Sequence, residues 1–166
     1  TCGVGFDAHI SSQFALSKKR GYKTYIQSVL KSFFSYDSEA YVVETDSEHF
    51  KCEAFLITCA NASQYGNNAY IAPHASLCDG IMDVAIIKPL EIYEAIPLAI
   101  QLFTKDIDSN KHVRRLRCKK INIHRCTSSI IHFDGDTANA DKDLCIEIIH
   151  NGLLVLTDRG KDKFVR

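Results

Sequence analysis

Acidic side chains at predicted tight turns are the most promising chemical groups in this sequence. In residues 72–84, Asp79 and Gly80 form a turn signal, because Asp caps its own backbone and Gly accepts a positive φ. Apolar residues 84–87 follow and predict a buried strand. A carboxylate held in such a turn beside exposed backbone carbonyls is a suitable site for a hard cation. A plain hairpin corner is the alternative interpretation.

A second acidic turn, Asp134-Gly135-Asp136, follows an apolar strand pattern. Two like charges this close require a cation, a basic partner or water. One interpretation is therefore a turn that handles magnesium or phosphate, and the other is a solvated hairpin tip. The later acids Asp141 and Asp143 fit no EF-hand spacing, so the sequence does not predict a calcium loop.

Two glycines, Gly3 and Gly5, precede a predicted helix. A glycine-rich turn at a helix start can bind anions through free backbone N–H groups. Close packing of backbone against backbone is the alternative reason for the two glycines. Asp7, at the start of this helix, is either its N-cap or a polar group that faces a ligand.

Basic residues cluster at Arg114, Arg115, Arg117, Lys119 and Lys120. At the period of a strand, Arg115, Arg117 and Lys119 share one face. That face could meet anionic lipid headgroups, or it could be a solvated strand edge protected by charge. The histidines are scattered, and neither a His-Glu-x-x-His motif nor a Gly-x-Ser-x-Gly elbow is present.

The composition bounds the class of protein. The 166 residues correspond to one domain, and 46% hydrophobic residues suffice for a sizeable core. Lys plus Arg and Asp plus Glu both number 20, which argues against nucleic acid as a partner. No apolar run is long enough to span a bilayer, and no secretory signal pattern is visible. The seven cysteines form no Cys-x-x-Cys pair, so we expect reduced thiols in a cytoplasmic protein and no zinc site.

The hydrophobic periodicity predicts a mainly antiparallel β-sandwich with added helices, an α+β class. Helices are expected at residues 6–16, 22–34 and 91–103, and Pro97 should kink or split the last of these. Strands are expected at residues 41–44, 50–59, 82–88, 114–126, 129–133, 144–149 and 153–156. The Asp134-Gly135 and Asn151-Gly152 pairs favour hairpins.

Taken in order, these motifs resemble the C-terminal domain of the diacylglycerol/sphingosine-type lipid kinases, the bacterial diacylglycerol kinase-like family. The shared order is a Gly-Phe-Asp-Ala opening, an Asn-rich segment at 59–73, an Asp-Gly-x-x-Asp-Val turn at 79–84 and an Asp-Gly-acid turn at 134–136. The likeness covers nearly the whole chain. It implies the β-sandwich of the NAD kinase/diacylglycerol kinase-like fold. Residues 1–166 would be the acceptor-side, C-terminal domain of a two-domain enzyme, with the N-terminal nucleotide-loop domain absent from this sequence.

The resemblance also implies a metal site and a nucleotide. Asp79 would supply a carboxylate to a structural Mg²⁺, with the backbone carbonyls of Ser76 and Ile81 beside it. ATP would be the co-substrate, bound in a cleft between the two domains. This implied metal site agrees with the hard-cation interpretation of the Asp79 turn.

Four further residues receive roles from the resemblance. Asp134 and Asp136 would be the catalytic acids that face the nucleotide phosphates, and Asp136 replaces the Glu of the family. Asp7 and His9 would bind the substrate by facing the lipid headgroup. His9 stands where some members carry an acid, so the identity of the lipid stays open.

The function implied is transfer of the γ-phosphoryl group of ATP to the hydroxyl of a diacylglycerol or sphingoid-like lipid. We expect the chain alone to be inactive, because the Gly-Gly-Asp-Gly-Thr loop and its acid are missing from it. The expected partners are a lipid at a membrane surface and the N-terminal kinase domain, and a homodimer is a further option. The protein would be cytoplasmic and peripheral to the membrane. A non-catalytic lipid- or partner-binding module and a NAD kinase-like enzyme are the alternatives.

Overall fold

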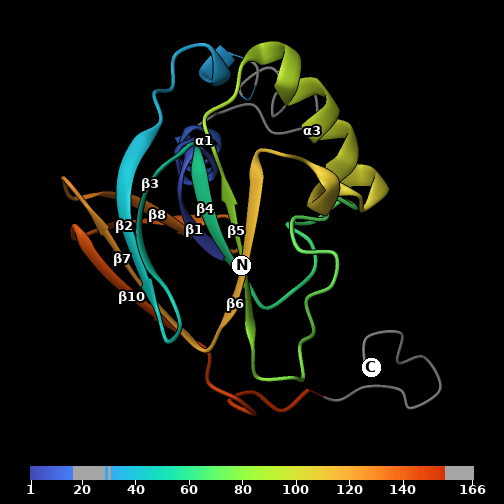
Figure 1. Ribbon diagram of the computed structural model, residues 1–166, viewed down its shortest axis with the longest axis vertical. Coiled ribbons are helices and arrows are strands. Elements are labelled where there is room, and N and C mark those ends of the chain that lie inside the picture. Colours follow the sequence, from blue (N-terminus) through green and yellow to red (C-terminus); the bar gives the residue numbers. More distant parts are fainter. Residues whose placement is uncertain (17–28, 30, 156–166) are drawn as a thin grey trace.

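Two antiparallel β-sheets face each other in the computed structural model, which describes residues 1–16, 29 and 31–155 (Figure 1). The larger sheet has six strands in the order β6-β5-β4-β1-β8-β9, and the smaller has four in the order β10-β7-β2-β3. Every strand pairing is antiparallel. The predicted β-sandwich with added helices is therefore confirmed.

The elements are short. The six-stranded sheet is made of β1 (Cys2–Gly5), β4 (Leu56–Ala60), β5 (Met82–Ile87), β6 (Val113–Cys118), β8 (Ser129–Phe133) and β9 (Asp136–Ala140). The four-stranded sheet is made of β2 (Glu39–Thr45), β3 (His49–Ala54), β7 (Lys120–Arg125) and β10 (Asp143–Glu147). Helical elements include α1 (Phe6–Leu16), α3 (Ile92–Thr104) and the short 3-10 helix η1 (Ile107–Ser109), and residues 31–33 are helical as well.

The core between the sheets is built by residues that alternate along each strand. In β7, Ile121 and Ile123 are fully buried, whereas Lys120 points to solvent. Val43 from β2 and Val84 from β5 are buried in the same cluster. This alternation places one face of each strand in the sandwich and leaves the other face free to be polar.

The strands β4 and β5 are buried on both faces, since every residue of either strand is buried. One face belongs to the sandwich core, and the other packs beneath the helices in a second core with Phe6, Ile10 and Leu98. A strand covered on both faces reads as a continuous apolar run, which is why residues 84–87 show no alternation.

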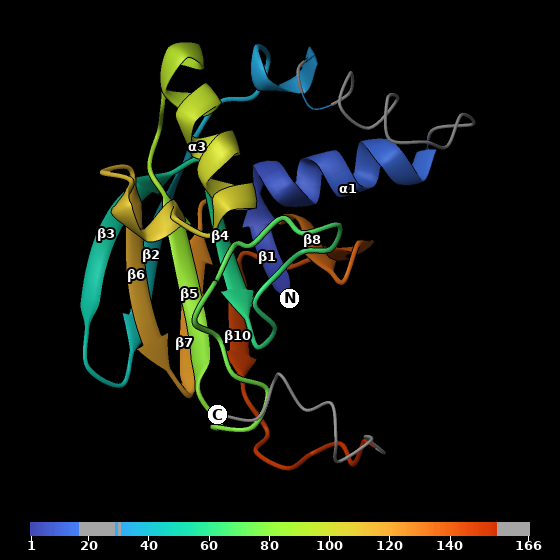
Figure 2. The same ribbon diagram turned by 90° about the vertical axis from the view of Figure 1, so that its right-hand side faces the viewer.

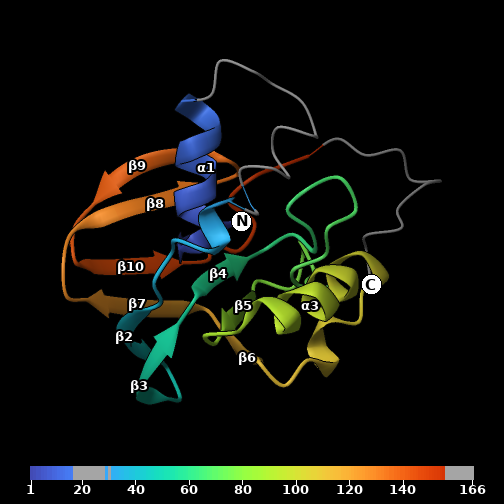
Figure 3. The same ribbon diagram turned by 90° about the horizontal axis from the view of Figure 1, so that it is seen from above.

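The two helices lie over different parts of the larger sheet. Figure 3 shows α1 beside β8 and β9, and α3 beside β5 and β6. Figure 2 shows the N-terminus at one end of β1 and α1 leaving its other end. The helix α1 thus begins directly above the middle of the sheet, and its first turn is held between β4 and β8.

Two predicted strands are each divided by a corner where the chain changes sheets. Residues 50–59 form β3 in the smaller sheet and β4 in the larger, with the break at Phe55. The Phe55 N–H donates to the Ile87 carbonyl at 2.7 Å, and the Phe55 carbonyl accepts from the Phe6 N–H at 2.9 Å. Residues 114–126 likewise divide at Lys119 into β6 and β7. Both predictions found the residues in strands and missed the corner.

Other element predictions were wrong or lie outside the described residues. The strands β1 and β9 were not predicted, residues 153–155 form no strand, and Asn151-Gly152 joins no hairpin. Pro97 does not split α3, which continues as one helix through it. The predicted helix at 22–34 lies mostly outside the described residues. None of the helices in the described part of the chain has the length and apolar character needed to cross a membrane.

Candidate active site

The acidic turn at Asp134 joins β8 to β9. Phe133 pairs with Asp136, and Asp134 and Gly135 between them both have positive φ, at 48° and 93°. This two-residue turn is the predicted hairpin, and Asp136 is the first residue of β9 rather than part of the loop. The Asp134 N–H donates to the Thr1 carbonyl at 2.9 Å, which ties the turn to the chain just before β1. Asp134 and Asp136 are both exposed.

The carboxylate of Asp7 is the centre of a second polar group, formed with Thr58, Tyr65 and His132. Its Oδ2 accepts a hydrogen bond from Thr58 Oγ1 at 2.6 Å and from the Tyr65 hydroxyl at 3.2 Å. The same oxygen lies 2.9 Å from His132 Nε2. Its Oδ1 accepts the Ala8 N–H at 2.8 Å. These partners come from α1, β4, the loop after β4, and β8, so the Asp7 cluster forms only in the folded chain.

His132 gives the Asp7 cluster its electrostatic character. The imidazole is 2% exposed. Burial by itself lowers the pKa of His132, but the hydrogen bond to Asp7 and its negative charge outweigh burial and raise that pKa. Nδ1 of the same ring is buried, and no residue in the described part of the chain forms a hydrogen bond with it.

Gly3 makes room for this cluster. A Cβ at Gly3 would lie 2.6 Å from the Ile57 carbonyl oxygen, 2.9 Å from Asp7 Oδ2 and 3.1 Å from His132 Nε2. The residue stands in the middle of the six-stranded sheet, between β4 and β8. The structure thus supports close packing, rather than an anion-binding loop, as the reason for this glycine. Gly5, with φ of 97°, makes the turn from β1 into α1.

The register of the sheet brings the predicted acids to one end of it. The pairs Ala60–Asp83 and Cys59–Cys2 place the end of β4 and the starts of β1 and β5 in one row. Cys2 also pairs with Phe133, which adds the Asp134 turn to that row. His132 lies two residues before Asp134, or about 7 Å along the strand. The Asp79 turn precedes β5, three strand spacings or about 14 Å from β8.

The Asp79 turn is closed by two donors of this chain. Asp79 Oδ1 accepts the Ile81 N–H at 3.0 Å, and Oδ2 accepts Arg117 Nη2 at 2.6 Å. Gly80 has φ of 66°, which completes the predicted turn. Within the described residues, no three His, Cys, Asp or Glu side chains are arranged to hold a metal. A cation bound by Asp79 and the carbonyls of Ser76 and Ile81 would have to displace Arg117.

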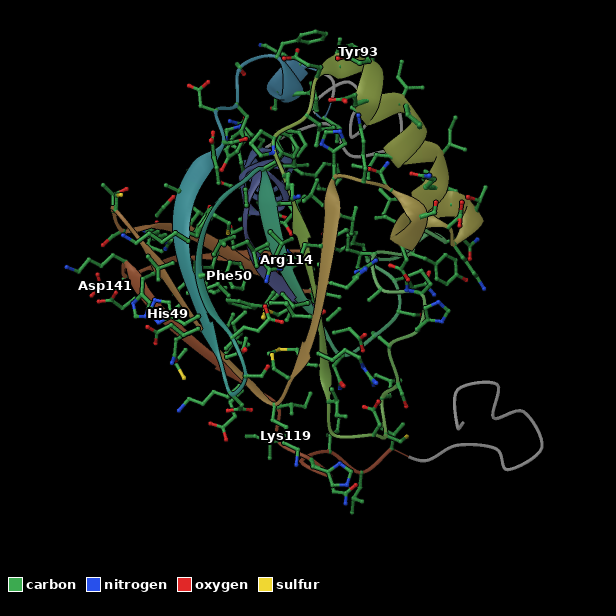
Figure 4. All side chains as sticks on the ribbon, viewed as in Figure 1. His49, Phe50, Tyr93, Arg114, Lys119 and Asp141 are labelled. Carbon is green, nitrogen blue, oxygen red and sulfur yellow. The ribbon has the colours of Figure 1, made fainter. Side chains whose placement is uncertain are left out.

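The arginines of the basic cluster, for which both a headgroup-binding face and a solvated strand edge were considered, all form ion pairs. Arg114 pairs with Glu48 and lies over the Phe50 ring, with its guanidinium carbon 3.6 Å from the ring centroid (Figure 4). Arg115 pairs with Asp108, and Arg117 with Asp79 and, at 3.5 Å, with Asp83. These ion pairs favour the strand-edge interpretation over a headgroup-binding patch.

His9 does not join the Asp7 cluster. Its ring lies 5.3 Å from that of Tyr36, centroid to centroid, beside stacked Phe6 and Phe55. Because residues two apart on a helix project about 200° from each other, the side chains of Asp7 and His9 lie on different sides of α1. Thr58, Tyr65 and His132 were not predicted as site residues from the sequence. His132 is 125 positions from Asp7, and no local motif links them.

An open groove of about 660 Å³ lies on the outer side of the four-stranded sheet. It is lined by residues of β2, β3 and β7, among them Lys51, Glu53 and His124. None of the predicted site residues lines it. We therefore place the candidate site at the end of the six-stranded sheet that carries the Asp7 cluster, and not in this groove.

A family model described as "YegS C-terminal NAD kinase beta sandwich-like domain" matches residues 1–156. Among solved structures, one described as "a putative diacylglycerol kinase from Bacillus anthracis str. Sterne" has a TM-score of 0.62 at 16% identity, covering 90% of this chain and 49% of its own. A diacylglycerol kinase structure from the same organism has a TM-score of 0.51 at 14% identity, covering 86% and 43%. The chain thus spans about half the length of these structures, and their likeness shows the fold alone. No curated protein matches the chain.

Proposed function

Because the chain belongs to the family of YegS C-terminal NAD kinase beta sandwich-like domains, we propose that it is the acceptor-side domain of an ATP-dependent lipid kinase. The reaction proposed is transfer of the γ-phosphoryl group of ATP to a lipid hydroxyl, with diacylglycerol or a sphingoid base as acceptor. The Bacillus anthracis structures of similar fold are described as diacylglycerol kinases, which supports a lipid acceptor.

The observation that carries the proposal is the placement of the Asp7 cluster and the Asp134 turn at one end of the same strand, β8. Phosphoryl transfer requires positioning and charge stabilisation more than covalent chemistry. In the proposed reaction, Asp7 binds the acceptor hydroxyl, and Asp134 and Asp136 face the phosphates. His132 is a positioning residue, because it orients the Asp7 carboxylate by a hydrogen bond and does not reach the phosphates.

The helix α3 supplies apolar surface suited to lipid chains. Tyr93, Ile96, Ile100 and Phe103 recur at helical spacing, and between 49% and 69% of each is exposed. Figure 4 shows Tyr93 at the outer end of this helix. Exposed apolar stripes of this kind are uncommon on a helix that faces only water. We include α3 in the lipid-binding surface on this basis.

Mg²⁺ and ATP belong to the same proposal. Mg²⁺ bound to ATP would neutralise phosphate charge, and the acids at the Asp134 turn are suitable neighbours for it. A structural Mg²⁺ at the Asp79 turn requires that Arg117 move aside, after which Asp79 and the carbonyls of Ser76 and Ile81 would hold it. Association with a membrane surface and with a nucleotide-binding domain completes the proposal.

The test is transfer of labelled phosphate from ATP. The chain is assayed alone, and joined to a domain that carries the Gly-Gly-Asp-Gly-Thr loop, against diacylglycerol micelles, a sphingoid base and NAD. We expect lipid phosphorylation by the two-domain protein and none by the chain alone. Phosphorylation of NAD but not lipid would replace the proposal by the NAD kinase-like alternative. Lipid binding without turnover by the two-domain protein would favour the non-catalytic module.

A further inference from the structure

Two cysteines face each other across neighbouring strands of the larger sheet. Cys2 of β1 and Cys59 of β4 are direct partners in the antiparallel register. Directly opposed residues in such a pair have Cα atoms about 4.5–5.5 Å apart. A disulfide spans Cα separations of about 4.4–6.8 Å, so these two backbones already stand at bridging distance.

The two thiols also interact with each other. The neighbouring Cys59 thiol is the main reason why the pKa of Cys2 falls to about 7, and burial opposes that shift. The Cys2 thiol and burial together raise the pKa of Cys59. The pair therefore contains one thiol that ionises readily and one that stays protonated beside it.

A small cavity borders Cys2. It measures about 90 Å³ and is lined by Cys2, His132, Leu144 and Cys145, among others. A water molecule occupies about 30 Å³ in the liquid, so the cavity admits an oxidant as small as hydrogen peroxide.

We propose that Cys2 and Cys59 form a redox-sensitive thiol pair that peroxide converts to a disulfide between β1 and β4. The Cys2 thiolate attacks one peroxide oxygen, the O–O bond breaks, and hydroxide leaves and takes up a proton to become water. Cys59 then attacks the Cys2 sulfenic acid, the S–S bond forms, and the sulfenic oxygen leaves as a second water. Two thiols are oxidised by two electrons, and one peroxide is reduced to two waters.

The position of this pair ties it to the Asp7 cluster. Cys2 precedes Gly3, and Cys59 follows Thr58, which donates to Asp7. A disulfide would join the two strands one residue from the places where they contact the cluster. Formation of the disulfide does not depend on the proposed kinase activity, so the two proposals can be tested independently.

The other cysteines are less suitable partners. Cys118 lies on β6, two strand spacings or about 10 Å from β4, which exceeds bridging distance. Cys52 lies on β3 in the other sheet, and packed sheets are about 10 Å apart. Cys78, Cys126 and Cys145 are exposed. Changing these three to Ser gives a background that keeps the proposed pair and removes the exposed thiols that would link two molecules.

The experiment treats this background protein with hydrogen peroxide and maps its peptides without reduction. We expect a Cys2–Cys59 linked peptide whose mass is lower by two hydrogen atoms and whose formation dithiothreitol reverses. C2S and C59A are the matched variants, and neither should give an internal disulfide. Over-oxidised Cys2 without the linked peptide, or a Cys2–Cys118 link, would overturn the proposal. So would a Cys2–Cys145 link in the unmutated chain.

A second measurement does not depend on disulfide formation. The rate at which iodoacetamide alkylates Cys2 should rise with pH to a midpoint near 7. In C59A that midpoint should move toward the ordinary thiol pKa of about 8.5, because the neighbouring thiol is gone. An unchanged midpoint in a folded C59A protein would show that the two thiols do not interact.

Discussion

At the scale of single residues, the Asp7 cluster combines a half-buried acid with a buried base. Asp7 was identified as a candidate from its place at the helix start, because an acid in the first turn after two glycines is visible in the sequence. Its partners could not be found that way. Thr58, Tyr65 and His132 reach Asp7 only because β4 and β8 flank β1 in the sheet.

The Asp7–His132 pair should make stability depend on pH. The pKa of His132 is raised above its ordinary value of 6.5 in the folded chain. The stabilisation is therefore fully present below that value and is lost as pH rises through the folded pKa. We expect the free energy of unfolding of wild type to exceed that of H132Q more at about pH 6 than at about pH 9. Urea unfolding of both proteins measures this, with H74Q as the exposed control. A gap that grows with pH would contradict it.

The contact between Gly3 and its neighbours predicts a large cost for a single methyl group. G3A would place a Cβ 2.6 Å from the Ile57 backbone oxygen. Overpacking against backbone costs roughly 1–3 kcal/mol, so the free energy of unfolding should fall by that amount. Denaturant melts compare it with G152A, where the nearest atoms, Cγ2 and the backbone oxygen of Ile149, lie farther away at 3.1 Å. Equal stability of G3A and wild type would show that the close approach is absent.

The ion pair at the Asp79 turn predicts competition between Arg117 and Mg²⁺. Arg117 Nη2 occupies Asp79 Oδ2 at 2.6 Å, so R117Q should free the carboxylate for a cation. We expect calorimetry to show tighter Mg²⁺ binding by R117Q than by wild type. R114Q, which changes an arginine paired with Glu48 instead, is the control. No Mg²⁺ binding by either protein would argue against a metal at this turn.

At the scale of elements, the hairpin that carries Asp134 is fixed by one buried arginine. Arg125 is 6% exposed, and its guanidinium donates to the carbonyls of Ser129, Ala140 and Asp141 at 2.8–3.0 Å, with a longer bond to Ile130. These carbonyls lie where β8 begins and β9 ends. Arg125 therefore ties the open end of the hairpin to β7 and fixes the direction in which its turn points.

Removing the Arg125 guanidinium should destabilise the hairpin. R125M would leave four carbonyls without this donor, and hydrogen bonds of charged groups contribute about 1.5–3 kcal/mol each at most. We expect a loss of roughly 3 kcal/mol in the free energy of unfolding, since water replaces part of the bonding. Thermal and urea melts measure it, with K51M on the exposed side of β3 as the control. A loss below that of K51M would contradict this role.

The helices, strands and turns also show what hydrophobic periodicity alone can predict. The helix at 6–16 and the turn at Asp134-Gly135 were predicted correctly, because helix and hairpin signals are local. The corners at Phe55 and Lys119 were not, because a strand that passes from one sheet to the other keeps its local pattern. The strand β1 was missed for another reason, since its two glycines serve tertiary packing and carry no strand propensity.

At the scale of the whole molecule, the sandwich collects acids that are far apart in the sequence. The sheet register places the turns of Asp79 and Asp134 and the row beside Asp7 at one end of the six-stranded sheet. The class of fold was predictable from many short strands and hairpin turns. The gathering of these acids at one end of the sheet was not predictable, because the strand order β5-β4-β1-β8 depends on pairings that no local pattern encodes.

The most direct measurement is the rate of lipid phosphorylation by the two-domain protein with D7N or D136N in this chain. We expect each variant to lose roughly 100-fold or more in kcat, the usual contribution of a positioned acid or base, while thermal melts show both variants folded at the assay temperature. E53Q, on the exposed side of β3, should keep full activity. Wild-type kcat in a folded D7N protein would contradict the role assigned to the Asp7 cluster.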